Sequence, residues 1–322
     1  SRVAIVMNGS PLFTGDANSG ESEIRRYIFE NDLLEALVAV PEQVFYNTGI
    51  ATYVWILTNR KSEGRKGKVQ LIDASGEGFW KPMRKSLGDK RREMDESHIA
   101  KVLDAYAAFE VDTDVSKVYP NSYFGYRKVT VDRPLQLNIQ TSAERMQNLD
   151  NEKQFAKLKE DDQAAYRGML EALPDKPYMS RDEFVGDLTA EAKSRGLKVA
   201  APLKKAIINA LGERDADAEA CTNAKGIPEA DTSIRDTERV PLDVEIDDYT
   251  QAEVLPHVPD AWVNTTKSGC DKTTGDVGKV GYEINFNRYF YVYTPPRPLE
   301  EIEGEILDLQ SEINDLMGKL FD

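Results

Sequence analysis

The sequence is poor in the residues that build metal centres and nucleophilic active sites. It contains two cysteines, Cys221 and Cys270, and two histidines, His98 and His257, among 322 residues. None of these has the spacing of metal ligands, and no Ser/His/Asp or Cys/His set is recognisable, so we predict no metal centre. A low cysteine count is typical of a reducing compartment and favours the cytoplasm.

Long hydrophobic runs are missing as well. No stretch of about 18 apolar residues occurs, so we predict no membrane span. The first seven residues, SRVAIVM, lack the pattern of a signal peptide and enter a strand pattern without an initiator methionine, so we expect a fragment of a longer polypeptide. With 40% hydrophobic and 30% charged residues, the chain is expected to form roughly two packed, soluble domains.

Basic charge is scarce except in one place. The net charge of −15 argues against a protein that binds nucleic acid mainly through its own surface. Residues 60–92 nevertheless hold eleven Lys and Arg against four Asp and Glu, whereas residues 211–260 hold four against fourteen. This distribution suits a chain that contacts phosphates at one place and depends on another subunit for its other contacts with nucleic acid.

The first 75 residues have the pattern of an α/β sheet. Apolar runs predict strands, and an amphipathic stretch that stops at Asn31 predicts a helix. The strands are predicted at residues 3–7, 34–40, 51–59 and 68–74, and the helix at residues 23–30. The third strand is apolar on both faces, which indicates a place inside a sheet that is covered on both sides.

Two adjacent aromatic residues, Phe45 and Tyr46, lie in the loop between the second and third predicted strands. Two rings presented at the end of a sheet can hold a flat, apolar-faced object such as an unstacked base. Alternatively, both rings fill the hydrophobic core. The pattern of these residues alone leaves both interpretations open.

The rest of the chain divides into a connector, a helical region and a last helix. Residues 76–143 are predicted to form a basic connector with a short helix at 95–109 and an aromatic strand at 123–131. Residues 144–298 are predicted to be mainly helical, with a polar, mobile loop near 212–238.

The last segment, residues 299–322, has a strict heptad pattern that follows a proline. Its apolar residues are Leu299, Ile302, Ile306, Leu309, Ile313, Leu316 and Leu320. One helix cannot bury this seam alone, so it packs either on its own domain or in a coiled coil with a partner chain. One lysine against eight acidic residues favours a partner with basic flanking positions.

Motifs that hold nucleotide-like cofactors are missing. A sheet that binds S-adenosylmethionine (AdoMet) has a glycine-rich turn after its first strand, and this sequence has none. Residues 275–280, GDVGKV, lack a hydroxyl residue after the lysine and a convincing preceding strand. We therefore predict no phosphate-binding loop.

Several segments, in order along nearly the whole chain, resemble one family. They are NGSPLFTG (8–15), GESEIRR (20–26), FYNTGIAT (45–52), MRKSLGDKR (83–91), FGYR (124–127), VLPHVPDAW (254–262), GYEI (281–284) and PPRPLEEI (295–302). Together they resemble the methylation subunit of type I restriction–modification systems.

The resemblance implies a subunit of an AdoMet-dependent DNA methyltransferase that modifies N6 of adenine. Such enzymes flip the target adenine out of the duplex and stack it while its amino group attacks the methyl group of AdoMet. The family's Phe-x-Gly-x-Gly cofactor motif and catalytic Asn-Pro-Pro-Phe loop lie upstream of the matched region, and this sequence contains neither. We therefore expect no catalytic residue in this chain, no AdoMet bound to it alone and no methylation by it alone.

The resemblance also implies a fold. It is an α/β fold with the later strands of a Rossmann-like methyltransferase sheet in residues 1–75. A mainly α-helical C-terminal region follows and ends in a coiled-coil-type helix.

Individual residues acquire expected roles from the resemblance. Phe45 has the position of the aromatic that packs on the flipped adenine, and Tyr46 is the close alternative. A basic cluster either contacts DNA phosphates or the partner subunit, or forms a merely solvated face. The members of this cluster are Arg84, Lys85, Lys90, Arg91 and Arg92.

The resemblance further implies partners. The heptad helix would join the helices of a specificity subunit that selects the DNA sequence, and the restriction subunit and double-stranded DNA complete the assembly. Two alternatives remain: a non-catalytic scaffold that acts through the heptad helix, and a stand-alone methyltransferase with a recognition domain in residues 110–298. The acidic charge argues against the second.

Overall fold

The computed structural model describes residues 1–46, 48–293 and 295–321, with side chains in the last helix described except at 315 and 318–321. The chain forms two compact units. The first unit consists of Ser1–Phe13, Asp32–Tyr119 and Ile284–Asp322, and the second of Thr14–Asn31 and Pro120–Glu283. Within the described part of the chain, no helix is long and apolar enough to cross a membrane.

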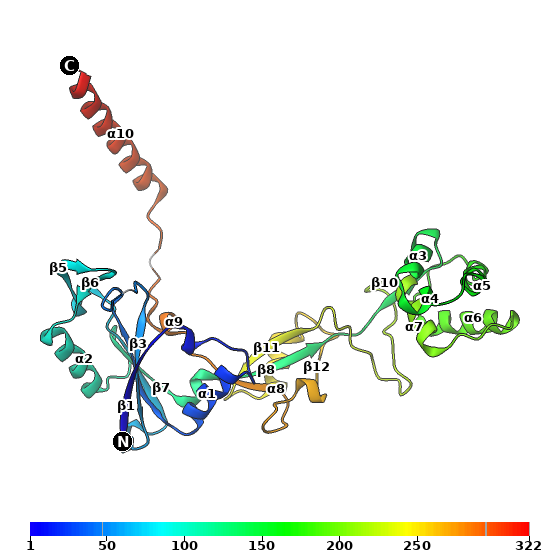
Figure 1. The fold of residues 1–322 in the computed structure, drawn as a ribbon, viewed down its shortest axis with the longest axis horizontal. Coiled ribbons are helices and arrows are strands. Elements are labelled where there is room, and N and C mark those ends of the chain that lie inside the picture. Colours follow the sequence, from blue (N-terminus) through cyan, green and yellow to red (C-terminus); the bar gives the residue numbers. More distant parts are fainter. Residues whose placement is uncertain (47, 294, 322) are drawn as a thin grey trace. The chain divides into compact units, whose positions relative to one another are not determined.

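A five-stranded sheet forms the centre of the first unit (Figure 1). In spatial order its strands are β1 (Arg2–Asn8), β3 (Thr52–Thr58), β2 (Leu34–Val40), β4 (Lys68–Asp73) and β7 (Ser116–Pro120). β3 runs antiparallel to both β1 and β2, whereas β2 and β4 are parallel. Four of these strands confirm the predictions from the sequence, and the α/β class is confirmed with a mixed sheet; β7 was not predicted.

The two faces of this sheet differ in how they are covered. All seven residues of β2 are buried, and β3 is largely buried between β1 and β2. Val38, Val40 and Ile72 pack against α2 (Glu96–Ala108). β1 is the opposite case, because all seven of its residues are exposed although its sequence is apolar. β1 pairs with β3 on one side only, and an exposed, apolar edge strand of this length is unusual, because such an edge readily pairs with a further strand.

The helix predicted at residues 95–109 is confirmed as α2. The Asp95 carboxylate accepts hydrogen bonds from the backbone N–H groups of Ser97 and His98, and the His98 ring accepts one from the Asp95 N–H. This reciprocal capping box satisfies amide groups that the first turn of a helix leaves unpaired.

The basic connector contains a hairpin that was not predicted. Strands β5 (Lys81–Leu87) and β6 (Lys90–Glu93) pair antiparallel across Gly88-Asp89. Gly88 has a φ of +63°, a left-handed conformation that glycine adopts at no steric cost. The hairpin carries the basic cluster defined above.

The C-terminal part of the first unit holds two helices. α9 (Phe286–Phe290) follows Ile284, whose backbone N–H donates to the Leu12 carbonyl over 2.8 Å. α10 (Leu299–Phe321) covers the predicted heptad segment.

A second sheet, around β8 (Gly125–Asp132), belongs to the second unit. β11 (Asp236–Pro241) pairs along one side of β8. On β8, β12 (Trp262–Val263) pairs with its end and β13 (Lys279–Tyr282) with its beginning. β8 confirms the predicted aromatic strand, whereas the three strands from residues 236–282 were not predicted.

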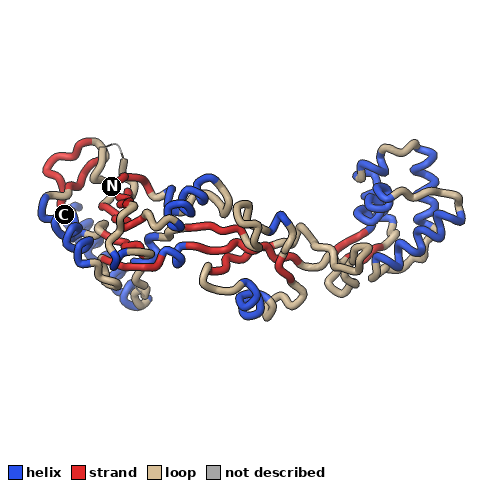
Figure 2. Tube along the Cα trace, turned by 90° about the horizontal axis from the view of Figure 1, so that it is seen from below, coloured by secondary structure: helices blue, strands red, loops and turns tan. Residues whose placement is uncertain are grey.

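Helices of residues 143–211 form a separate core within the second unit (Figure 2). They are α3 (Ala143–Gln147), α4 (Lys153–Ala156), α5 (Glu160–Glu171), α6 (Arg181–Ser194) and α7 (Ala201–Leu211). Phe155, Met169, Phe184 and Leu188 are fully buried there. Pro202 lies in the first turn of α7, where its missing N–H costs no hydrogen bond.

Residues 212–238, predicted as a mobile loop, make several specific contacts. β10 (Gly212–Arg214) pairs with β9 (Leu137–Ile139), and Arg214 forms an ion pair with the buried Asp231 at 2.5 Å. Arg181 pairs with Glu229 at 2.8 Å. The mobility of this segment remains a prediction.

A buried carboxylate joins α1 (Gly20–Glu30) to residues 271–280 within the second unit. Both carboxylate oxygens of Asp271 lie 3.1 Å from Arg26 Nη1. The same carboxylate accepts the backbone N–H groups of Thr273, Thr274 and Val280 at 2.9–3.0 Å. Burial, the largest single influence, opposes ionisation, but the hydrogen bonds and Arg26 together lower the pKa of Asp271.

Candidate functional site

The strand ends of the first unit converge at one edge of its sheet. Asn8, the last residue of β1, lies opposite Thr52, the first residue of β3, and so does Val40 at the end of β2. Asp73, the last residue of β4, pairs with Ala39. In open α/β sheets, ligands bind outside the carboxyl ends of parallel strands, so this edge is the natural place for a site.

A cavity of about 270 Å³ lies at this edge. Its walls come from the ends of the strands, from β6 and from the C-terminal segment, and all its lining residues belong to the first unit. They are Ala39, Val40, Glu42, Ala51, Tyr53, Asp73, Ser75, Arg92, Phe286 and Asn287.

The charged groups of this cavity are the carboxylates of Glu42 and Asp73 and the guanidinium group of Arg92. Burial raises the pKa of the Tyr53 hydroxyl, and the carboxylates of Asp73 and Glu42 raise it further. Asp73 is held in place because its Oδ1 accepts hydrogen bonds from Ser75 N at 3.0 Å and Ser75 Oγ at 2.6 Å. Two carboxylates against one guanidinium group leave a negative balance of charge, which disfavours a phosphate and suits a neutral ligand that carries N–H donors.

The loop after β2 presents the two predicted rings. Phe45 is 39% exposed and Tyr46 is 62% exposed, so neither ring fills the core. Gln43 has a φ of +63°, and its carbonyl oxygen accepts the N–H groups of Arg91 at 3.0 Å and Arg92 at 3.1 Å. The loop is therefore tied to the basic hairpin.

The five residues of the basic cluster differ in their exposure and in their contacts. Arg84, Lys85 and Arg91 are exposed, and Lys90 lies over the Tyr46 ring, 5.4 Å from its centre. Arg92 lines the cavity and stacks on Trp80, with its guanidinium carbon 3.9 Å from the ring centre. The hairpin therefore presents exposed positive charge, and its residue Arg92 also lines the cavity that contains Glu42 and Asp73.

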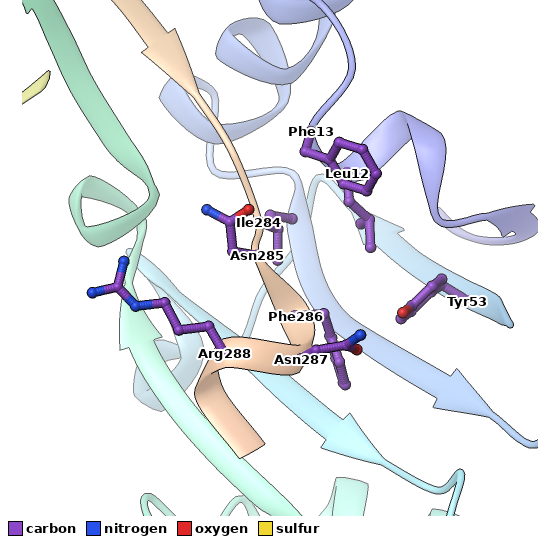
Figure 3. Close-up of a pocket in the computed structure, with 8 residues that line it drawn as sticks. All are labelled: Leu12, Phe13, Tyr53, Ile284, Asn285, Phe286, Asn287 and Arg288. Carbon is purple, nitrogen blue, oxygen red and sulfur yellow. The ribbon is translucent and has the colours of Figure 1, made fainter. Parts of the chain in front are cut away.

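A smaller cavity of about 170 Å³ adjoins the first, with which it shares Tyr53, Phe286 and Asn287 (Figure 3). Its other lining residues are Leu12, Phe13, Ile284, Asn285 and Arg288. Tyr53 and Phe286 meet edge to face, with ring centres 5.2 Å apart. This aromatic pair is common to both cavities.

Five of the heptad residues of α10 are exposed in the described part of the structure. Leu299, Ile306, Leu309, Ile313 and Leu316 are all more than half exposed. Ile302 is partly buried, and the side chain of Leu320 lies outside the described part of the structure.

Sequence reasoning missed Glu42, Tyr53, Asp73, Phe286 and Asn287 as cavity residues. Glu42 lies two residues after one predicted strand and Asp73 is the last residue but one of another, which is a weak signal on its own. Asn287 belongs to an aromatic stretch that lies more than 200 residues after Tyr53 in the sequence. No residue near Asn287 in the sequence indicates that it lies at this edge of the sheet.

Comparisons with known proteins relate the N-terminal part of the chain to DNA methylases. The family model described as N-6 DNA Methylase matches residues 1–127. The MjaIX methylase subunit of a type I restriction enzyme from Methanocaldococcus jannaschii is 33% identical over 132 residues, which cover 41% of this chain and 22% of that protein. The HindI methylase subunit from Haemophilus influenzae is 34% identical over 110 residues, which cover 34% and 22%.

A solved structure gives a related match. It is the type I restriction-modification methyltransferase subunit from Streptococcus thermophilus, at 26% identity and a TM-score of 0.32, covering 38% of this chain and 24% of that one. The matched region spans about a fifth of the length of the curated relatives. The predicted resemblance to type I methylation subunits is thus confirmed for a portion of the chain.

Proposed function

We propose that this chain is the C-terminal part of a methylase subunit of a type I restriction enzyme, and that the parent enzyme transfers a methyl group from AdoMet to N6 of adenine in DNA. The similarity of the matched portion to such subunits supports this proposal. The observation that carries this proposal is the sheet edge. There the loop that presents the exposed rings of Phe45 and Tyr46 is hydrogen-bonded through Gln43 to Arg92, which lines the cavity together with Glu42 and Asp73. The parent is proposed to be cytoplasmic.

The base-stacking role is assigned to the loop after β2. A flipped adenine has apolar faces and an amino donor, which correspond to the exposed rings of Phe45 or Tyr46 and to the carboxylates of Glu42 and Asp73. The backbone phosphates of the DNA would contact the basic hairpin, since the carboxylates disfavour a phosphate inside the cavity.

The catalytic groups are proposed to come from residues outside this sequence. The exposed, apolar β1 would pair with the strand that ends in the Asn-Pro-Pro-Phe loop of the parent. This pairing would complete a Rossmann-like sheet and bring the catalytic loop to the same edge. Such pairing would cover β1, all of whose residues are exposed in the described part of the structure.

We propose that AdoMet binds outside this sequence. The two cavities described at the sheet edge have no glycine among their lining residues, whereas a glycine-rich turn is what lets the backbone approach such a cofactor. The cofactor is therefore assigned to the upstream part of the parent, and the isolated chain is proposed to be inactive.

Assembly is assigned to α10. Its exposed heptad residues would form a coiled-coil-type contact with the helices of a specificity subunit, which selects the DNA sequence. A restriction subunit and double-stranded DNA would complete the complex. Delegated target selection is compatible with the net charge of −15.

Labelled methyl transfer tests the proposal. The full-length polypeptide with its specificity subunit is expected to transfer tritiated methyl groups from AdoMet to unmethylated DNA, and hydrolysis of the DNA should yield N6-methyladenine. The 322-residue chain alone is expected to transfer none. A methylated cytosine as the product, or methyl transfer by the isolated chain, contradicts the proposal.

A further inference from the structure

The C-terminal segment Ile284–Phe290 is fixed on the sheet of the first unit. Phe286 is only 4% exposed and lies between Tyr53, at a ring-centre distance of 5.2 Å, and Phe290, at 5.1 Å. Tyr289 contacts Tyr119 at 5.1 Å. These contacts and the hydrogen bond from Ile284 to Leu12 hold the backbone of the segment in one place, so its polar side chains have a defined position.

Among these side chains, Asn287 is the one that lines both cavities. Asn285 and Arg288 line only the smaller one. Figure 3 shows that Asn287 extends to the side of the segment where Tyr53 lies, whereas Arg288 extends to the opposite side. The Asn287 side chain is exposed and, within the described part of the chain, its amide makes no hydrogen bond. Its donor and acceptor are therefore available to a ligand in the larger cavity.

We propose that the Asn287 carboxamide recognises the edge of the flipped adenine, an inference that rests on the proposed function. The amide N–H donates to ring nitrogen N7, and the amide oxygen accepts from the N6 amino group. An asparagine side chain matches this pair of groups on adenine in geometry. Guanine carries an acceptor oxygen where adenine carries the amino group, so the same contact rejects guanine.

The position of Asn287 makes the role specific to this residue. Asn285 lies two residues earlier, is also exposed and has the same side chain, but it does not line the larger cavity. It is therefore a matched control for the loss of an exposed amide from the same segment.

The experiment uses the full-length enzyme with its specificity subunit, and variants Asn287→Ala and Asn285→Ala. Loss of a two-bond contact is expected to lower kcat/KM for methylation of unmethylated DNA by about 10- to 100-fold in Asn287→Ala. Asn285→Ala should remain within about twofold of the wild type, and both variants should unfold at the wild-type temperature because both side chains are exposed.

A base analogue separates contact with the adenine from an indirect effect. The same assay is run on DNA synthesised with 7-deazaadenine, which lacks N7. The ratio of wild-type to Asn287→Ala kcat/KM should shrink on this DNA, because the wild type has lost its N7 partner as well. Taking this ratio cancels any effect of the analogue on sequence selection elsewhere.

The outcomes distinguish failure of the Asn287 inference from failure of the proposed function. Methylation by the wild type together with an unchanged Asn287→Ala variant overturns this inference alone, as does an equal ratio on both DNAs. Absence of adenine methylation by the wild-type enzyme overturns the proposed function, and this inference with it.

Discussion

Replacement of Phe286 by alanine is expected to loosen the C-terminal segment from the sheet of the first unit. The ring is buried between Tyr53 and Phe290 and forms part of the wall of both cavities. If it holds the segment in place, its loss should destabilise the first unit and also misplace Asn287.

The size of the effect follows from the burial of the ring. Phe→Ala substitutions in protein cores cost about 3–5 kcal/mol. Phe286 adjoins two cavities, so the surroundings can relax, and we expect the lower end of this range, about 3 kcal/mol. Phe286→Leu retains most of the apolar volume and is expected to cost less than about 1.5 kcal/mol.

Chemical denaturation followed by tryptophan fluorescence measures this cost. Trp55 and Trp80 belong to the first unit and Trp262 to the second, so a Trp262→Phe background restricts the signal to the first unit. The Phe286→Ala variant should lower the denaturation midpoint without changing the slope m.

Two results would refute the reasoning. A loss below about 1 kcal/mol would mean that the segment contributes little to the stability of the sheet. Equal losses in Phe286→Ala and Phe286→Leu would mean that the volume of the ring is not what the site requires.

Three further predictions concern other parts of the chain. Asp271→Asn should destabilise the second unit by about 1.5–3 kcal/mol, because it removes a buried charged hydrogen-bond partner of Arg26, which retains its ion pair with Glu30. The lowered pKa of Asp271 contributes stability that is present above the ordinary Asp pKa and lost as pH falls through the folded-state pKa. Urea unfolding of the variant should therefore show a weaker acid-side decline in stability, and an equal decline would contradict the assignment. Leu309→Asp in α10 should change the free energy of unfolding by less than about 0.5 kcal/mol, because the residue is 58% exposed. The same variant should no longer co-purify with the specificity subunit. Retained co-purification would argue against this surface as the interface. Arg84→Glu together with Lys85→Glu should weaken DNA binding by the assembled enzyme and reduce the slope of log Kd against log salt by about 2, whereas an unchanged slope would leave the hairpin a solvated surface.

The parts of the fold that were predicted correctly have local signals. β2 and β3 are mainly apolar runs of seven residues, with Glu35 in β2 and a threonine at each end of β3, so their strands follow from the local pattern. α2 begins at an aspartate and has an amphipathic pattern. These elements are therefore specified by their own local sequence and do not depend on distant partners for their identification.

The strands that were missed are specified by distant partners. β11, with the sequence DTERVP, and β13, with KVGY, have little apolar periodicity of their own. They become strands because β8, more than 100 residues earlier, offers them hydrogen-bonding edges. β5 and β6 were missed because charged side chains on both strands conceal the alternation that marks a half-buried strand.

The candidate site shows the same division. Phe45 and Tyr46 could be singled out because adjacent rings in a loop are conspicuous, and their exposure is compatible with the proposed role without testing it. Glu42 and Asp73 are ordinary acidic residues until the register of β2 and β4 brings them to one edge. Asn287 required knowledge of a contact between β3 and a segment more than 200 residues later.

Methylation by the full-length enzyme with Phe45→Ala tests the central claim most directly. Phe45 is 39% exposed, so the substitution should cost little stability, while base–aromatic stacking is worth about 1–3 kcal/mol. The account predicts a drop of about 5- to 150-fold in the rate of adenine methylation at an unchanged denaturation midpoint, with partial recovery in Phe45→Trp. A wild-type rate in Phe45→Ala, or a loss of rate that only follows a loss of folding, would contradict the assignment of this loop to the flipped base.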